Sequence, residues 1–160
     1  MTHNENNPQA RMAEKIAQID SICARARIMP VITIAREADI LPLADALAAG
    51  GLTALEVTLR SVHGLTAIRL LREQRPELCV GAGTVLDRSM LAAVEQAGAQ
   101  FVVTPGCTQD ILEAGVESPL PLLPGMPWGR CPPRPRRRPR STARRCVPTA
   151  TACEGPAPAA

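Results

Sequence analysis

The sequence predicts an α/β protein in which parallel strands alternate with helices, as in a (β/α) barrel. Short apolar segments recur about every 19 to 25 residues, and a segment with helical spacing of apolar residues lies between each pair. Parallel strands need such crossover connections, because a tight turn joins only antiparallel neighbours. The pattern fits both a doubly wound open sheet and a (β/α) barrel. Short connections and near-equal units favour the barrel.

The predicted strands are short apolar segments, several of them rich in β-branched residues. They cover residues 28–34, 54–60, 79–85, 101–105 and 119–125. Eight βα units close a barrel of this kind. The five units predicted here therefore make an incomplete (β/α)8, or TIM, barrel.

The predicted helices show apolar residues at spacings of three and four. A lead-in helix covers residues 11–26. Its apolar residues are Met12, Ile16, Ile19 and Ile22. Four later helices are predicted from the apolar sets Ile40, Leu43, Ala44 and Leu47; Leu65, Ile68 and Leu71; Met90, Leu91, Val94 and Ala97; and Ile111 and Leu112. Each stripe indicates a helix with one apolar side.

Several residues mark where these helices begin and end. Asp87 and Thr108 are expected N-caps, because a short oxygen-bearing side chain can accept a hydrogen bond from a free backbone N–H of the first turn. Gly50, Gly98 and Gly115 are expected to end the helices that precede them, since glycine tolerates the backbone conformation found there.

The chain changes character after Gly125. Residues 1–125 carry ten Lys and Arg against fourteen Asp and Glu, whereas residues 126–160 carry eight Arg and one Glu. Frequent prolines in the second segment remove backbone donors, and neither a helical nor a strand period survives there. We expect residues 1–125 to form the barrel domain and residues 126–160 to be a disordered Arg- and Pro-rich tail.

The basic tail raises an alternative function, binding of nucleic acid through RPRRRPR at residues 134–140. Arginines contact phosphates, but no aromatic residues interleave them for base stacking. We therefore do not expect nucleic acid to be the partner. The start of the chain lacks a signal-peptide pattern and no apolar run could span a membrane, so we expect a cytoplasmic protein without a membrane partner.

The segment ALEVTLR, residues 54–60, holds the most informative polar residues. Alternate side chains of a strand point to opposite faces, so Glu56, Thr58 and Arg60 are expected to share one face. A polar face is unusual in a helix-covered parallel sheet, and it either meets solvent or lines a site. In a barrel, a buried Glu56 could shuttle protons. Arg60 would suit a carboxylate or a phosphate.

Two further segments end predicted strands. In GAGTV, residues 81–85, the glycines allow close approach of the backbone and Thr84 offers a hydroxyl. A dinucleotide fingerprint would require a glycine or alanine where Leu86 stands, so a nucleotide site is not expected. TPG at residues 104–106 could form part of a pocket wall. The six cysteines show no zinc spacing, and we expect neither a metal nor a cofactor.

The motifs PVITI, GGLTALEVTLR, VGAGTV, GAQFVVTPG and PLLPG occur in this order between residues 30 and 125. In these motifs the chain resembles the 2-keto-3-deoxy-6-phosphogluconate (2-dehydro-3-deoxy-phosphogluconate) aldolases, from about Ile16 to Gly125. The resemblance implies a class I, Schiff-base lyase of the Entner-Doudoroff pathway of carbohydrate metabolism on a (β/α)8 barrel. Such enzymes are homotrimers that release pyruvate and glyceraldehyde 3-phosphate without a cofactor. The preferred sugar-acid epimer, or a 4-hydroxy-2-oxoglutarate substrate, stays open.

The resemblance also implies roles for individual residues. Glu56 matches the general acid/base, Arg60 and Thr84 match the groups that hold the pyruvoyl carboxylate, and Thr104 and Pro105 match the pocket wall. The family's Schiff-base lysine follows P-G-I, in F-K-x-F-P-A-E, and this element does not occur in these 160 residues.

The chain contains one lysine, Lys15, in the predicted lead-in helix. Imine formation needs an amine, and a guanidinium cannot replace it because it stays protonated. We therefore expect this chain to be inactive. We also expect that a shifted reading frame after Gly125 produced the truncated pattern and the Arg- and Pro-rich tail.

Overall fold

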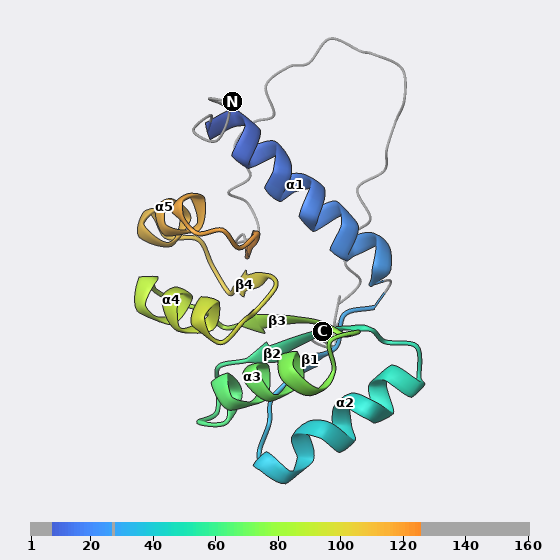
Figure 1. The fold of residues 1–160 in the computed structure, drawn as a ribbon. Helices are drawn as coiled ribbons and strands as arrows, with labels where there is room; N and C mark the ends of the chain where they lie inside the picture. Colours follow the sequence, from blue (N-terminus) through green and yellow to red (C-terminus); the bar gives the residue numbers. More distant parts are fainter. Residues whose placement is uncertain (1–7, 27, 126–160) are drawn as a thin grey trace, which may run out of the picture. The chain divides into compact units, whose positions relative to one another are not determined.

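A computed structural model describes residues 8–26 and 28–125 (Figure 1). The expected tail, and with it the alternative nucleic-acid function, lies outside the described residues. The strands are β1 (Val31–Ile32), β2 (Ala54–Thr58), β3 (Cys79–Gly83), β4 (Val102–Thr104) and β5 (Leu122–Pro124). All neighbouring pairs are parallel, and the order in the sheet is β1-β2-β3-β4-β5.

This sequential order decides between the two predicted architectures. A doubly wound sheet reverses its strand order at a switch point, with helices on both faces. The five strands of the described chain run in order without a reversal, as consecutive strands of a (β/α)8 barrel do. The prediction of an incomplete barrel is confirmed, with five strands and, among the described residues, a helix after each of β1 to β4.

The helices follow the predicted order. They are α1 (Pro8–Arg25), α2 (Ile40–Ala49), α3 (Gly64–Gln74), α4 (Arg88–Gln96) and α5 (Gln109–Glu117), and a single 3-10 turn, η1 (Glu37–Asp39), precedes α2. None of the helices among the described residues is both long and apolar enough to cross a membrane.

The two predicted N-caps are confirmed. The Asp87 carboxylate accepts a hydrogen bond from the Met90 N–H at 2.8 Å, and the Thr108 hydroxyl accepts one from the Ile111 N–H at 3.3 Å. Gly115 does not end its helix, because α5 continues to Glu117. A methyl group at Gly115 would lie 2.5 Å from the Leu122 side chain, so close packing on β5 explains this glycine.

Each face of the sheet has its own apolar cluster. The helix-covered face packs strand residues against α2 to α5. Its strand members include Leu55, Val57, Val80, Ala82 and Val102. The opposite face, which we call the inner face, carries the alternate strand residues and packs Ala54, Cys79 and Phe101 against Ile22 of α1. Helix α1 thus contacts the inner face near the amino ends of the strands, while α2 to α5 cover the other face.

The strands are shorter than the apolar segments predicted. Strand β1 covers two residues instead of seven, and among the described strands it pairs with β2 alone, through Val31 with Glu56 and Ile32 with Val57. Strand β2 ends at Thr58, because the chain turns away after the Leu59 N–H donates to the Gly83 carbonyl oxygen. Apolar composition marks which segments are buried, whereas the ladder ends where no neighbouring backbone continues.

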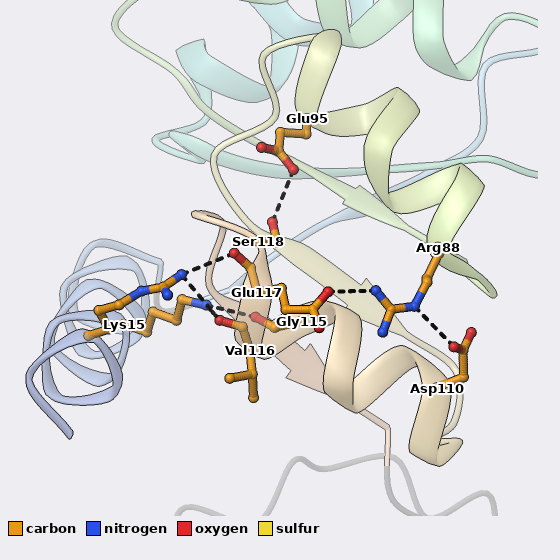
Figure 2. A network of polar contacts seen from close by, with 9 residues as sticks. Lys15, Arg88, Glu95, Asp110, Gly115, Val116, Glu117 and Ser118 are labelled. Carbon is orange, nitrogen blue, oxygen red and sulfur yellow. Dashed lines mark hydrogen bonds and ion pairs between the residues drawn. The ribbon is translucent and has the colours of Figure 1, made fainter. Parts of the chain in front are cut away.

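Polar contacts connect α1, α4 and α5 (Figure 2). The Arg88 guanidinium of α4 donates to Asp110 at 3.0 Å and to Glu117 at 2.6 Å, both on α5. The Ser118 hydroxyl donates to Glu95 at 3.2 Å. The exposed ion pairs add little stability by themselves. Together the contacts fix how the last turn of α5 lies against its neighbours.

Candidate active site

The candidate residues lie on β2 or at the carboxyl ends of β2, β3 and β4. Glu56 and Thr58 lie on β2, Thr84 directly follows β3, and Thr104 is the last residue of β4. The carboxyl ends of parallel strands meet at one edge of a sheet, and (β/α) barrels build their sites there. The register sets Thr58 beside Gly83 and Glu56 beside Gly81.

Glu56 points to the inner face, away from helices α2 to α5. Its neighbours along the strand, Leu55 and Val57, belong to the helix-covered cluster, and alternation sends Glu56 the other way. Only 9% of Glu56 is exposed. Burial raises the pKa of its carboxyl, and the positive charge of Arg60 opposes that rise. A carboxyl held in this way can exist protonated at a higher pH than an exposed one.

Arg60 lies in the turn after β2, whereas the prediction placed it on the strand. It is not part of β2, so it does not continue the alternation that Glu56 and Thr58 follow, and its side chain is exposed. The turn after the strand nevertheless brings its Nε to donate to the Thr84 hydroxyl at 3.2 Å. The prediction that Arg60 belongs to the strand is wrong, whereas its charge acts on Glu56 and its Nε contacts the residue that follows β3.

Thr84 has an uncommon backbone conformation. Its φ of 62° lies in the left-handed region, and it is the single non-glycine residue with positive φ among those the structure describes. A β-branched side chain is strained there, at a cost of about 1–3 kcal/mol. This turn places the hydroxyl beside Arg60, and a guanidinium fork with a neighbouring hydroxyl is suited to hold a carboxylate.

Thr104 and Pro105 lie at the same edge, on the strand next to β3. The Thr104 side chain is buried, and its hydroxyl donates to the Gly106 carbonyl oxygen at 2.7 Å. Its own carbonyl oxygen accepts from the Gly125 N–H at 2.8 Å. Thr104 is therefore engaged in shaping its turn, which leaves Pro105 exposed at the edge. The structure groups Glu56, Arg60 and Thr84 and leaves this pair two strands from β2.

Sequence reasoning missed Thr33. Its hydroxyl lies 2.7 Å from the hydroxyl of Thr58, which is 1% exposed. Val31 pairs with Glu56, so the alternation along the first predicted strand puts Thr33 on the inner face as well. The alternation along residues 28–34 was the feature of the sequence that could have identified Thr33. It places the Thr33 and Thr58 hydroxyls on the same face as Glu56.

A sequential all-parallel sheet with polar residues at its carboxyl edge defines a protein of the (β/α) barrel class. The family model for aldolases described as "KDPG and KHG aldolase" matches residues 19–128. The chain belongs to this family.

Two curated relatives are particularly informative. The chain is 66% identical over 115 residues to a 2-dehydro-3-deoxy-phosphogluconate aldolase of Pseudomonas aeruginosa, a stretch that covers 72% of this chain and 52% of that protein. It is 45% identical over 107 residues to a KHG/KDPG aldolase of Escherichia coli, covering 67% of this chain and 50% of the relative. The chain thus spans about half the length of these relatives.

Solved structures of aldolases of this family match the chain as well. A 2-keto-3-deoxy-6-phosphogluconate aldolase of Zymomonas mobilis, crystallised with 3-phosphoglycerate, matches with a TM-score of 0.64 and 46% identity, over 66% of this chain and 50% of that one. The KDPG aldolase of Legionella pneumophila, with pyruvate captured as a covalent carbinolamine, matches with a TM-score of 0.64 and 43% identity, over 65% and 50%.

Proposed function

We propose that residues 1–125 form the amino-terminal part of a class I aldolase domain and carry its acid/base and carboxylate-binding groups. Glu56 is the proposed general acid/base. Arg60 and Thr84 are the proposed carboxylate-binding pair, and Thr104 and Pro105 form part of the wall. The observation that carries the proposal is the grouping of Glu56, Arg60 and Thr84 at the carboxyl edge of β2 and β3.

The proposed reaction cleaves a phosphorylated 2-keto-3-deoxy acid into pyruvate and an aldehyde. In a class I aldolase an amine adds to the keto carbon, the carbinolamine loses water, and the imine accepts the electron pair of the breaking carbon–carbon bond. A carboxyl with a raised pKa can donate and accept protons in these steps at a higher pH than an exposed glutamate could. The Arg60 fork would hold the substrate carboxylate beside that carboxyl.

The sequence of 160 residues limits what this chain can do. Its one lysine, Lys15, donates from Nζ to the Gly115 and Val116 carbonyl oxygens at 2.7 and 2.9 Å, at the last turn of α5. That turn leads back to the beginning of β5, whereas the proposed site lies where strands end. We therefore expect carboxylate binding without imine formation or turnover.

Pyruvate is the probe for this proposal. In a titration followed by NMR of the full chain, we expect weak saturable binding that Arg60→Ala abolishes. Arg69→Ala, which removes an exposed arginine of α3, is the matched control and should bind as the parent does. Equal pyruvate affinity in the parent and in Arg60→Ala would contradict the proposed role of Arg60.

Imine formation is tested separately. Incubation with pyruvate and borohydride, followed by intact mass measurement, should leave the parent chain without an adduct. A stable adduct would show that Lys15 or the amino terminus can supply the amine, and would overturn the expected inactivity.

The resemblance further implies a homotrimer and a cytoplasmic location. Sedimentation analysis of the full chain would test the prediction of a homotrimer.

A further inference from the structure

The segment GAGTV carries two glycines on the inner face of β3. Gly81 lies beside Glu56 and Gly83 lies beside Thr58 in the β2–β3 register. Ala82, between them, belongs to the helix-covered cluster. Both glycines therefore lack a side chain on the face to which Glu56 points.

The two glycines leave room for different neighbours. A methyl group at Gly81 would overlap the ring of Phe101. A methyl group at Gly83 would overlap the Glu56 Oε1 atom and would lie 2.8 Å from its Cδ and 2.9 Å from its Cγ. Ordinary carbon contacts are about 3.5–4.0 Å. The Glu56 side chain thus crosses to the neighbouring strand and lies over the α-carbon of Gly83.

We propose that Gly83 is the positioning residue for Glu56, because its missing side chain forms the seat in which the carboxylate lies. The seat fixes two properties of the carboxylate. It directs the group toward the carboxyl end of β3, where Thr84 follows at once, and it lets the side chain lie close enough to the sheet to be 9% exposed. The catalytic consequence rests on the function proposed above for Glu56, whereas the seat itself does not.

The seat explains the electrostatics of Glu56. Desolvation is the larger influence on the pKa of this carboxyl and raises it, and Arg60 is the charged group that acts on it among the residues described. A side chain at position 83 would push the carboxylate off the sheet toward water. Its pKa would then fall toward the ordinary range of an exposed glutamate.

Gly83→Ala tests the seat in the full chain. Alanine is compatible with the backbone here, because the φ of Gly83 is not in the left-handed region. We expect a lower pKa of the Glu56 carboxyl, followed by NMR titration of its labelled side-chain carbon, and a lower urea midpoint. An unchanged Glu56 titration in a folded Gly83→Ala variant would overturn the proposal.

A double-mutant cycle separates the seat from a general packing role. If position 83 acts through Glu56, then most of the loss of stability caused by Gly83→Ala should disappear in a Glu56→Ala background. An equal loss in both backgrounds would overturn the proposal. Should Gly83→Ala alone fail to fold, a folded Glu56→Ala/Gly83→Ala chain supports the seat and an unfolded one contradicts it.

Two other glycines supply controls. Gly106→Ala meets no atom within 4 Å and should leave both readouts unchanged. Gly115→Ala creates an overlap of comparable severity with Leu122 on the helix-covered side, so it should lower the urea midpoint without changing the titration of Glu56. A shift of the Glu56 titration in Gly115→Ala as large as that in Gly83→Ala would count against a specific seat. Failure of pyruvate to bind would contradict the proposed function while leaving the seat supported.

Discussion

The Lys15 ammonium of α1 donates a 2.7 Å hydrogen bond to the carbonyl oxygen of Gly115, one hundred residues further along the chain. The Val116 carbonyl oxygen accepts from the same ammonium at 2.9 Å (Figure 2). The Arg11 guanidinium donates to the Val116 and Glu117 carbonyl oxygens at 3.5 and 3.0 Å. The last carbonyl groups of a helix have no partners within it, and they carry its negative dipole end. Two cations of α1 thus cap α5 from outside.

Lys15→Met should therefore destabilise the chain. The substitution keeps an unbranched stem but leaves the Gly115 and Val116 carbonyl oxygens without their donor, at an expected cost of about 1–3 kcal/mol in the free energy of unfolding. Urea denaturation measures the change. Glu14→Met, at an exposed position one residue earlier, is the control and should change stability little. Equal stability of the parent and Lys15→Met would mean that the contact contributes nothing to the fold.

Much of the fold could be predicted from periodicity, because parallel strands and amphipathic helices leave strong, regular patterns. The order of elements and the caps at Asp87 and Thr108 follow from such patterns. The ends of the strands could not be predicted, because a ladder ends where the neighbouring backbone diverges, and this is a property of the other strand. Gly115 shows the same limit, since only the packing of Leu122 explains why it lies inside a helix.

The residues of the candidate site could be predicted from the sequence, whereas the positions of some of their side chains and backbones could not. Alternation along β2 placed Glu56 on the inner face, and the structure agrees. Alternation could not place Arg60, because Arg60 lies beyond the end of β2 and contacts Thr84 from the turn that follows the strand. The left-handed backbone of Thr84 had no signal in the sequence, because threonine is a poor choice for that conformation.

Asp87→Ala should lower stability in a pH-dependent way. Hydrogen bonds from the Ser89 hydroxyl and the Met90 N–H lower the pKa of the Asp87 carboxyl. A lowered folded-state pKa contributes stability that is present above the unfolded-state pKa and is lost as the pH falls through the folded-state value. Denaturation of both chains at several pH values should show a difference at neutral pH that shrinks in acid. Asp39→Ala removes an N-cap residue whose side chain pairs with the exposed Arg36 and makes no capping hydrogen bond, so it reports the effect of losing a surface carboxylate without a cap.

Thr84→Gly should make the fold more stable and the proposed site weaker. Glycine adopts the left-handed backbone without strain, so relief of strain outweighs its entropic cost and we expect a gain of about 1 kcal/mol. The substitution also removes the hydroxyl that Arg60 contacts, so pyruvate should bind less tightly. Thr84→Ser keeps the hydroxyl and should preserve binding. A loss of stability in Thr84→Gly would show that the contact with Arg60 outweighs the strain.

Glu56→Gln should stabilise the folded chain as the pH rises. Burial raises the folded-state pKa of Glu56, so its contribution to stability is fully present below the unfolded-state pKa and is lost as the pH rises through the folded-state value. Glutamine is neutral and avoids that loss. The variant should therefore match the parent at and below about pH 4, the ordinary pKa of glutamate, and become the more stable chain as the pH rises above it, as urea denaturation at each pH would reveal. Glu73→Gln, at an exposed position on α3, corrects for the general effect of removing one carboxylate. A difference between Glu56→Gln and the parent that is constant with pH would mean that the carboxylate is as well solvated in the folded chain as in the unfolded one.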